Sequence, residues 1–311
     1  MLTTATNIAE AMAASGNYRA GGTDYMDRLR HEMLSDEIVD LQGIGLNQIE
    51  TDSSGATTIG AMTTVFNLSQ TPYIRDNYPA LAQAAGALAT PQIRQMATVG
   101  GNLTQATRCQ YYRHSELDCT KKGDAKCGGR EGYHPNGVIF DNGGCAHPHP
   151  STLGMALIAY NAEIEINGES KRPITNLYGD GSDTSRDHLL SEGELITAII
   201  LPSPQPEKSA YFRASQRARA EWATIECVAR LHMAGDRIKS AEVAVGAVGP
   251  VPLRMAKVEE ALAGSPTTEE AFVQAAALAA EGATPLRENG YKVQLMVMSI
   301  AKTLGQAAGL E

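Results

Sequence analysis

The sequence has few aromatic residues, no excess of basic charge and no long apolar run. Its 26 lysines and arginines face 35 aspartates and glutamates, so the formal net charge is −9. Without a basic stripe, nucleic acid and anionic membranes are disfavoured as partners. No apolar run reaches the ~20 residues of a membrane span, and residues 1–16 lack the basic and apolar regions of a signal peptide. We therefore expect a cytoplasmic protein, unless a partner carries it out.

Motifs of substrate chemistry are missing as well. There is no nucleophile elbow, no metal–water constellation and no pair of carboxylates in a recognisable setting. The G-x-G-x-x-G dinucleotide fingerprint is also absent, which disfavours a Rossmann-type NAD site. The sequence thus shows no sign of a self-contained catalytic centre.

The 311 residues are more than one small hydrophobic core normally serves, so two or three structural units are expected. Hydrophobic periodicity predicts mixed helices and strands up to Leu201, followed by the proline-rich linker Pro202–Pro206. The pattern then restarts with a strand at 241–248 and helices at 257–262, 269–280 and 291–308. We place a domain boundary near residue 206.

Two glycine turns stand at predicted helix starts. Gly21–Gly22 is followed by Thr23, and Gly100–Gly101 is followed by Asn102. Glycine turns of this kind let several N–H groups approach a phosphate where no side chain blocks the way. Taken alone, either motif is better explained as a plain structural turn.

Four cysteines fall in one irregular, glycine-rich window with the spacing C-x9-C-x7-C-x17-C, at Cys109, Cys119, Cys127 and Cys145. Thiolates suit iron–sulfur clusters, zinc or copper(I), and the absence of close cysteine pairs argues against structural zinc. Chemistry therefore favours an iron–sulfur cluster, with zinc and structural thiols as alternatives. Nearby basic residues either offset the charge of such a cluster or form a solvated loop. Cys227, in an apolar stretch, is expected to be an inert core thiol.

Five segments carry a family resemblance. They are AGGTD at 20–24, TIGAMTT at 58–64, QIRQMATVGGNL at 92–103, ELITAIILP at 194–202 and VAVGAVGPVP at 243–252. In this order they resemble the FAD-binding subunits of the xanthine dehydrogenase / carbon monoxide dehydrogenase family, the molybdenum hydroxylases. Because they extend over nearly the whole chain, the resemblance covers both expected units.

The resemblance implies an α+β fold. Residues 1–205 would form a two-lobed FAD-binding domain of the molybdopterin dehydrogenase type, and residues 207–311 a smaller α+β C-terminal flavoprotein domain. FAD would lie between the lobes, held by Ala20, Gly21, Gly22, Thr23, Asp24, Tyr25, Thr98, Gly100, Gly101, Asn102, Ser151, Ile196 and Arg213. Two departures stand out: Ser151–Thr152 replaces the family's Ser-Asp pair, and the pattern predicts a late N-terminus without the usual first strand.

The cysteine window resembles an insertion found in a subset of the family. RCQYYR at 108–113, DCTKK at 118–122 and CAHPHPS at 145–151 look like the [4Fe–4S] insertion of the flavoprotein subunits of periplasmic aldehyde oxidoreductase and 4-hydroxybenzoyl-CoA reductase. The resemblance implies an insertion at about 106–149 with one cluster on the four cysteines. His114, His134, His147 and His149 would pack around it rather than ligate it.

The implied function is electron transfer. A large subunit with a molybdenum cofactor would act on an aldehyde or aromatic substrate, and a small subunit with [2Fe–2S] clusters would relay electrons to or from this flavin. Export together with a partner subunit would make the protein periplasmic instead. The rival functions are a stand-alone FAD-dependent oxidoreductase and a zinc-stabilised scaffold.

Overall fold

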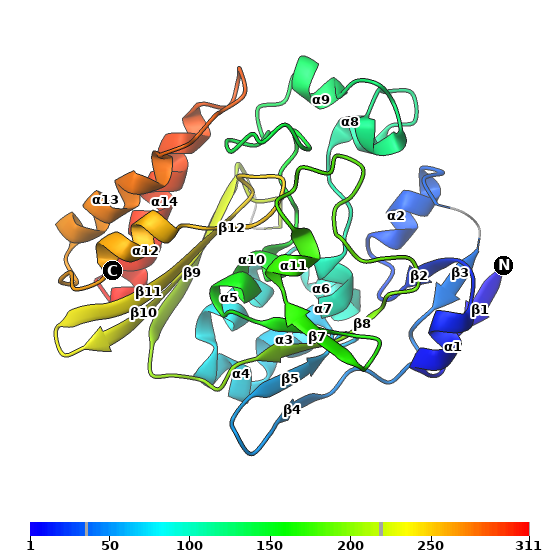
Figure 1. The fold of residues 1–311 in the computed structure, drawn as a ribbon, viewed down its shortest axis with the longest axis horizontal. Helices are drawn as coiled ribbons and strands as arrows, with labels where there is room; N and C mark the ends of the chain where they lie inside the picture. Colours follow the sequence, from blue (N-terminus) through cyan, green and yellow to red (C-terminus); the bar gives the residue numbers. More distant parts are fainter. Residues whose placement is uncertain (35–36, 218–219, 311) are drawn as a thin grey trace.

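The computed structural model of the chain describes residues 1–34, 37–217 and 220–310. These residues form three β-sheets with helices packed on them, and a loop-rich insertion lies at one end of the molecule (Figure 1). The expected α+β fold class is confirmed. In the part of the chain that the structure describes, no helix is long and apolar enough to span a membrane.

The first sheet is small and parallel, with the order β1-β3-β2. Its strands are β1 (Leu2–Thr4), β2 (Asn17–Arg19) and β3 (Ile38–Asp40), and its helices are α1 (Ile8–Ala13) and α2 (Tyr25–Arg30). The prediction that the chain begins without a first strand is wrong, because β1 pairs with β3. This strand has only three residues and Leu2 is 62% exposed, so no apolar alternation marks it in the sequence.

The second sheet is antiparallel, with the order β4-β5-β8-β6-β7. Its strands are β4 (Ile49–Thr51), β5 (Thr57–Gly60), β6 (Glu163–Ile166), β7 (Ser170–Pro173) and β8 (Ile196–Leu201). Short helices accompany it: α3 (Val65–Gln70), α4 (Pro72–Asn77), α5 (Pro79–Ala87), α6 (Pro91–Met96), α7 (Val99–Leu103), α10 (Thr152–Ala159) and α11 (Thr175–Tyr178). A proline opens α4, α5 and α6, where its fixed φ suits the first turn and its missing N–H is not needed.

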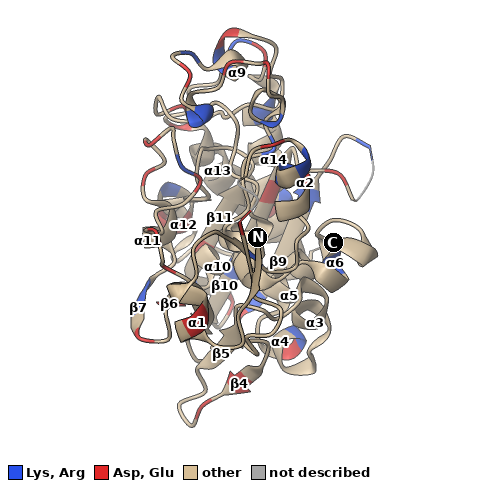
Figure 2. Cartoon of the chain, turned by 90° about the vertical axis from the view of Figure 1, so that its right-hand side faces the viewer, with Lys and Arg blue, Asp and Glu red and all other residues tan. Residues whose placement is uncertain are grey.

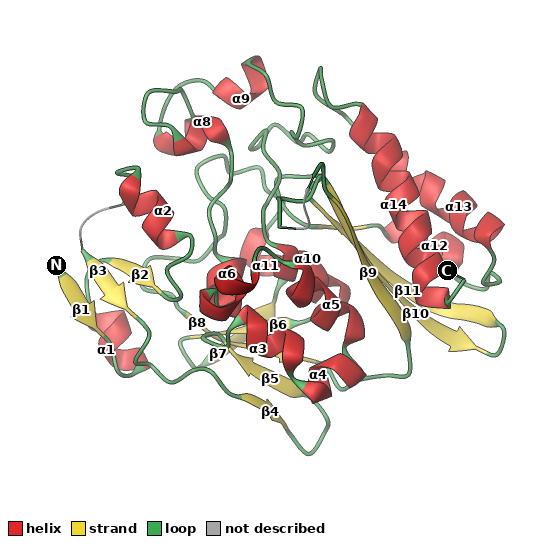
Figure 3. Cartoon of the chain, turned by 180° about the vertical axis from the view of Figure 1, so that it is seen from behind, coloured by secondary structure: helices red, strands yellow, loops and turns green. Residues whose placement is uncertain are grey.

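The third sheet is antiparallel, with the order β12-β11-β10-β9, and has helices on both faces (Figures 1 and 3). Its strands are β9 (Lys208–Ala214), β10 (Ile225–Ala234), β11 (Arg237–Gly246) and β12 (Leu253–Arg254). One face packs on α12 (Ala256–Leu262) and α14 (Tyr291–Ala308). These two helices in turn contact α13 (Glu269–Ala277) and the 3-10 turn η2 (Leu278–Ala280). The other packs on α5 and α10. Cys227 and Val228 are therefore both fully buried, in different cores, and the prediction of Cys227 as a core thiol is confirmed.

The insertion connects α7 to α10 and holds only short helical turns: α8 (Gln110–Arg113), η1 (Thr120–Lys122) and α9 (Gly128–Glu131). It has a small core of its own, formed by Ala106, Cys109, Tyr112 and Cys119. Figure 2 shows that basic and acidic residues alternate along the backbone of the insertion. With so little regular structure, the shape of the insertion depends on contacts with the rest of the chain.

Candidate functional site

A cleft of about 390 Å³ lies where the first sheet and its helices meet the second sheet. This size is typical of small-molecule sites. Three segments form most of its wall: the turn between β2 and α2, helix α7, and residues 188–196 leading into β8. The residues of the first turn that line it are Ala20, Gly21, Gly22, Thr23, Asp24 and Tyr25, and those of the other segments include Thr98, Gly100, Gly101 and Ile196. The fold thus brings both predicted glycine turns to one cavity.

The two glycine turns pack against each other through backbone contacts that leave no room for side chains. A Cβ at Gly21 would lie 1.8 Å from the carbonyl oxygen of Met96, just before the second turn. A Cβ at Gly100 would lie 3.0 Å from the Cβ of Ala61 and 3.2 Å from the carbonyl oxygen of Ala61. Gly22 has a φ of +76°, a conformation that favours glycine. Glycine at these positions is therefore required by close approach and by backbone conformation.

The turns differ in the N–H groups that they offer. In the second turn the N–H of Gly100 donates to Ala61 O, and those of Gly101 and Asn102 donate to the side chain and the carbonyl of Thr98. In the first turn, the N–H groups of Gly22 and Thr23 enter no hydrogen bond among the described residues. The first turn is thus the better donor of N–H groups to an anion, and the second turn is its rigid support.

Two polar side chains at the cleft were not predicted. Arg28 lies one helical turn beyond Asp24, and its Nε has no hydrogen-bond partner among the described residues. His188 lies in the opposite wall with its Nδ1 likewise unpartnered within the described chain, and burial lowers the pKa of its ring. The position of Arg28, four residues after Asp24 on a predicted helix, was a usable signal. His188 had none, because it lies in an irregular loop.

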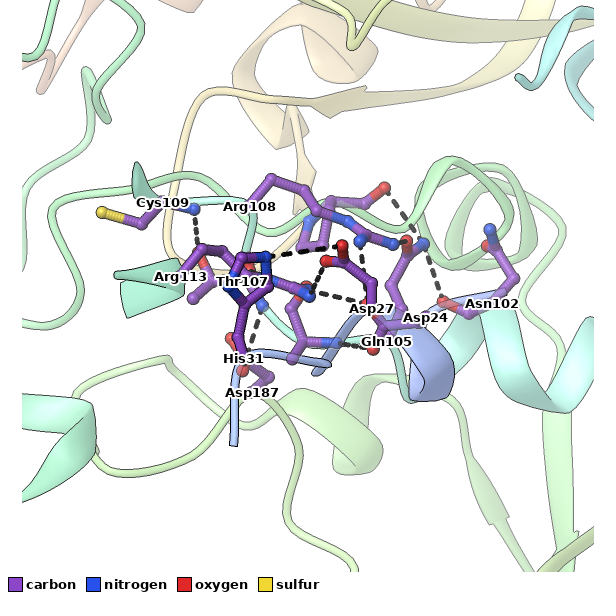
Figure 4. Close-up of polar contacts among 12 residues, drawn as sticks. Asp24, Asp27, His31, Asn102, Gln105, Thr107, Arg108, Cys109, Arg113 and Asp187 are labelled. Carbon is purple, nitrogen blue, oxygen red and sulfur yellow. Dashed lines mark hydrogen bonds and ion pairs between the residues drawn. The ribbon is translucent and has the colours of Figure 1, made fainter. Parts of the chain in front are cut away.

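Asp24 points to the insertion (Figure 4). Its carboxylate accepts from Arg113 at 2.7 Å and lies 2.8 Å from the guanidinium of Arg108. It also accepts the N–H of Ala106 at 3.1 Å. Burial acts to raise the pKa of Asp24, but the two arginines outweigh it and hold that pKa below its usual range. Asp24 therefore remains charged and joins the cleft to the insertion.

Three of the residues predicted to hold the cofactor do not line the cleft. Asn102 is buried behind the second turn, where its side-chain oxygen accepts from Ser151 Oγ at 2.8 Å and Leu153 N at 3.2 Å. Ser151 caps helix α10. Arg213, on β9, donates to Ala87 O at 3.4 Å. The structure gives Asn102 and Ser151 a supporting role behind the cleft.

The insertion brings the four cysteines to one end of the molecule. Cys109 and Cys119 are buried, and Cys127 and Cys145 are partly exposed. Burial raises the pKa of Cys109 to about 11 and that of Cys145 to about 12. Four soft donors suit an iron–sulfur cluster. However, no three or more His, Cys, Asp or Glu side chains among the described residues form a group that could hold a metal ion. The donor chemistry fits, and the ligand geometry is not preformed.

Several charged residues of the insertion are engaged in specific contacts. Lys121 lies 3.3 Å from Asp187, whose other oxygen accepts the N–H of Thr107 at 3.2 Å. Arg130 forms an ion pair with Asp141, and the Lys122 side chain donates to backbone carbonyls. Because Asp187 precedes His188 of the cleft wall, the insertion is anchored to both walls, through Asp24 and through Asp187.

The histidines of the insertion differ in their surroundings. His134 and His147 pack with ring centroids 5.0 Å apart, and His134 Nε2 lies 3.8 Å from Cys109 Sγ. Burial lowers the pKa of His147 to about 3 and that of His149 to about 4. His114 is exposed. The buried rings are thus uncharged near neutral pH.

Comparisons with known proteins match both parts of the chain. Residues 2–204 match the family of the FAD binding domain in molybdopterin dehydrogenase, and residues 210–307 match that of the CO dehydrogenase flavoprotein C-terminal domain. The FAD-binding subunit of an aldehyde oxidoreductase from Escherichia coli (strain K12) is 30% identical over 93% of this chain and 90% of its own. The carbon monoxide dehydrogenase medium chain of Hydrogenophaga pseudoflava is 25% identical over 97% of this chain and 94% of its own.

Solved structures show the same fold. Reconstituted CO dehydrogenase from Oligotropha carboxidovorans superposes with a TM-score of 0.77 at 22% identity, covering 99% of this chain and 97% of that one. Cu,Mo-CO dehydrogenase gives a TM-score of 0.76 at 21% identity, covering 100% and 98%. The resemblance drawn from the five sequence segments is confirmed: the chain belongs to the FAD-binding flavoprotein subunits of the molybdopterin dehydrogenase family.

Proposed function

We propose that the chain is the FAD- and [4Fe–4S]-containing electron-transfer subunit of a molybdenum-dependent oxidoreductase that acts on aldehydes or aromatic substrates. The observation that carries the proposal is the cleft in which two glycine turns meet with no room for a side chain at Gly21. Bound FAD would supply the exchange between one-electron and two-electron transfer. The 30% identical relative, which is the FAD-binding subunit of an aldehyde oxidoreductase, supports the aldehyde class.

The residues of the cleft divide the work of holding FAD. Gly22 and Thr23 would donate their N–H groups to the diphosphate, since no hydrogen bond among the described residues uses them. Arg28 would add a positive charge on the same wall. Leu195 and Ile196, which are buried and line the cleft, would supply apolar surface for the flavin ring.

The iron–sulfur part of the proposal rests on the set of donors. Four thiols lie in one insertion with its own small core, and none of them is in a disulfide. A cubane needs one thiolate for each iron, so four cysteines complete its ligand set. Cluster assembly would then draw the four thiols together and order the loop around them.

We further propose the rest of the assembly. A large subunit with the molybdenum cofactor would meet the organic substrate, and a small subunit with [2Fe–2S] clusters would connect it to this flavin. The domain boundaries are placed at 1–205 and 207–311, with the insertion at about 106–149. The chain would lie in the cytoplasm, with the periplasm as the alternative if it is exported together with a partner subunit.

The test compares the chain alone with the chain co-purified with its neighbouring gene products. Anaerobic stopped-flow absorbance should show that an aldehyde bleaches the flavin only in the complex. The chain alone should react with artificial electron donors but not with organic substrates. Rapid flavin reduction by an aldehyde in the isolated chain would instead establish a stand-alone oxidoreductase.

A further inference from the structure

The first glycine turn carries acidic residues where an anion is expected. Asp24 ends the turn and lines the cleft, and Asp27 follows within the first turn of α2. An FAD diphosphate carries two negative charges. Like charges in a partly buried site repel strongly, because the low local dielectric weakens screening. Unless these carboxylates are neutralised, they oppose the binding of FAD at this turn.

The insertion supplies the neutralising charges (Figure 4). Arg113 contacts both carboxylates, Asp24 at 2.7 Å and Asp27 at 2.6 Å. Arg108 contacts Asp24 at 2.8 Å, and Trp222 covers its guanidinium at 4.5 Å. Two guanidiniums thus balance two carboxylates, and Arg28 is left to give this wall a net positive charge.

Burial makes the pairing of Asp24 effective. The side chains of Arg113, Asp24 and Arg108 are only 11%, 14% and 18% exposed. Arg113 is also held in place, because its Nε donates to Thr107 O at 2.9 Å and one terminal nitrogen donates to Ala106 O at 3.1 Å. Asp27 is 46% exposed, so solvent screens it and its share is smaller.

We propose that Arg108 and Arg113 of the cysteine insertion are positioning residues for FAD, which neutralise Asp24 and Asp27 and thereby make the first glycine turn receptive to the diphosphate. The inference rests on the proposed function. It also changes the role of Asp24, whose negative charge opposes the diphosphate until the arginines of the insertion neutralise it. The insertion is then part of the flavin site as well as the holder of the cysteines.

The arginines could act by neutralising charge or only by linking the insertion mechanically to the turn. These two explanations predict different effects on FAD binding when Asp24 is replaced. If the ion pair were only a mechanical link, losing either partner would weaken FAD binding. If the arginines neutralise the acids, Arg113→Gln weakens binding while Asp24→Asn does not, because an amide at position 24 repels no phosphate. The double variant Asp24→Asn/Arg113→Gln restores the balance of charge and should regain affinity.

The experiment titrates the full-length, flavin-stripped chain with FAD and follows flavin fluorescence at low and at high salt. We expect Arg113→Gln to raise the Kd roughly 10- to 100-fold, with a smaller effect at high salt. Asp24→Asn should bind as well as wild type or better, and the double variant should return to within about threefold of wild type. Arg113→Lys should bind FAD better than Arg113→Gln, since lysine keeps the positive charge. It should bind FAD less well than wild type, since lysine lacks the planar, bidentate donors of arginine.

Arg130→Gln is the matched control, because it breaks another arginine–aspartate pair of the insertion, with Asp141, away from the cleft. It should leave the Kd unchanged. Should Arg113→Gln fail to fold by circular dichroism, Arg108→Gln makes the same comparison. Equal weakening by Asp24→Asn and Arg113→Gln, or no effect of either, would overturn the inference alone. A wild-type chain that binds no FAD would overturn the proposed function and the inference together.

Discussion

The cleft and the cysteine insertion are both proposed cofactor sites, yet they differ in how far the binding geometry is formed without the cofactor. At the cleft, the close approach of Gly21 to Met96 and of Gly100 to Ala61 forms the cavity before any ligand arrives. In the insertion, four thiols gather without forming a ligand group among the described residues. The cleft is built by backbone packing, whereas the insertion offers donors whose final arrangement depends on the metal.

This difference has a physical cause. A diphosphate site needs open N–H groups and no intruding side chains, which backbone conformation alone provides. A cluster site needs four thiolates at fixed distances. Binding of the metal releases the protons of the thiols, and its free energy offsets the entropy lost when they become ordered. The raised pKa values of Cys109 and Cys145 show that the folded insertion disfavours thiolates without a metal.

The largest expected effect comes from filling the contact between the two glycine turns. Gly21→Ala places a methyl carbon only 1.8 Å from the carbonyl oxygen of Met96, so the two turns must move apart. FAD binding should be lost, with a stability cost of about 3 kcal/mol or more, measured by fluorescence titration and chemical unfolding.

Gly305→Ala is the control for Gly21→Ala. Gly305 lies in α14, and a Cβ there would meet nothing within 4 Å outside its own helix backbone. This change should keep FAD binding and add up to about 1 kcal/mol of stability. Normal FAD affinity in Gly21→Ala would show that the turns do not form the cofactor site.

Much of the fold could be predicted because its signals are local. The linker at 202–206 follows from proline content and the long helix at 291–308 from periodicity, and the structure ends β8 at Leu201 and has α14 at Tyr291–Ala308. Strand β1 could not be predicted, since its three residues are stabilised by pairing with β3 across the chain.

The site was predictable where it depends on glycine and not where it depends on packing at a distance. The glycine turns lie where the sequence segments place them. Asn102 and Ser151 belong to those segments, yet they face each other behind the cleft, a contact between residues 49 positions apart. Arg28 could have been found from its spacing of one helical turn after Asp24, whereas His188 lies in the irregular 188–196 loop, which no motif marks.

The second largest effect concerns iron. Cys119→Ser should lower iron and sulfide from about four of each per chain to well below one, because a buried ligand is lost. FAD should stay bound, since the contacts of Arg108 and Arg113 with Asp24 involve none of the four cysteines. Iron assay and low-temperature electron spin resonance of the anaerobically purified, reduced protein check this.

Cys227→Ser is the matched control, because this thiol is fully buried in the core between the third sheet and its helices. Iron content should be unchanged in it. Iron loss in Cys227→Ser, or one zinc per chain in place of iron, would refute the cluster and leave the cleft untouched.

The smallest expected effect concerns His149, which connects the insertion to the rest of the chain, and the pH dependence of stability. His149 Nδ1 accepts the N–H of Ser151 at 3.2 Å and its Nε2 donates to Asp187 O at 3.1 Å, so the neutral ring satisfies both contacts. Burial lowers its pKa from the ordinary 6.5 to about 4. Below pH 6.5 the unfolded chain therefore binds this proton while the folded chain does not.

The stability that neutral His149 confers is thus complete above pH 6.5 and is lost as the pH falls toward 4, by up to about 3 kcal/mol. Urea unfolding between pH 4 and 7 should show a shallower loss in His149→Gln than in wild type. The exposed His31→Gln serves as control and should keep the wild-type slope. If stability fell equally with pH in all three proteins, the burial of neutral His149 would not contribute to stability.

The most direct test of the account is the identity and amount of flavin in the full chain. Denaturing the purified protein and separating the supernatant by chromatography should release one FAD per chain, directly or after reconstitution. Release of FMN, or no flavin after incubation with excess FAD, would contradict the assignment of the cleft.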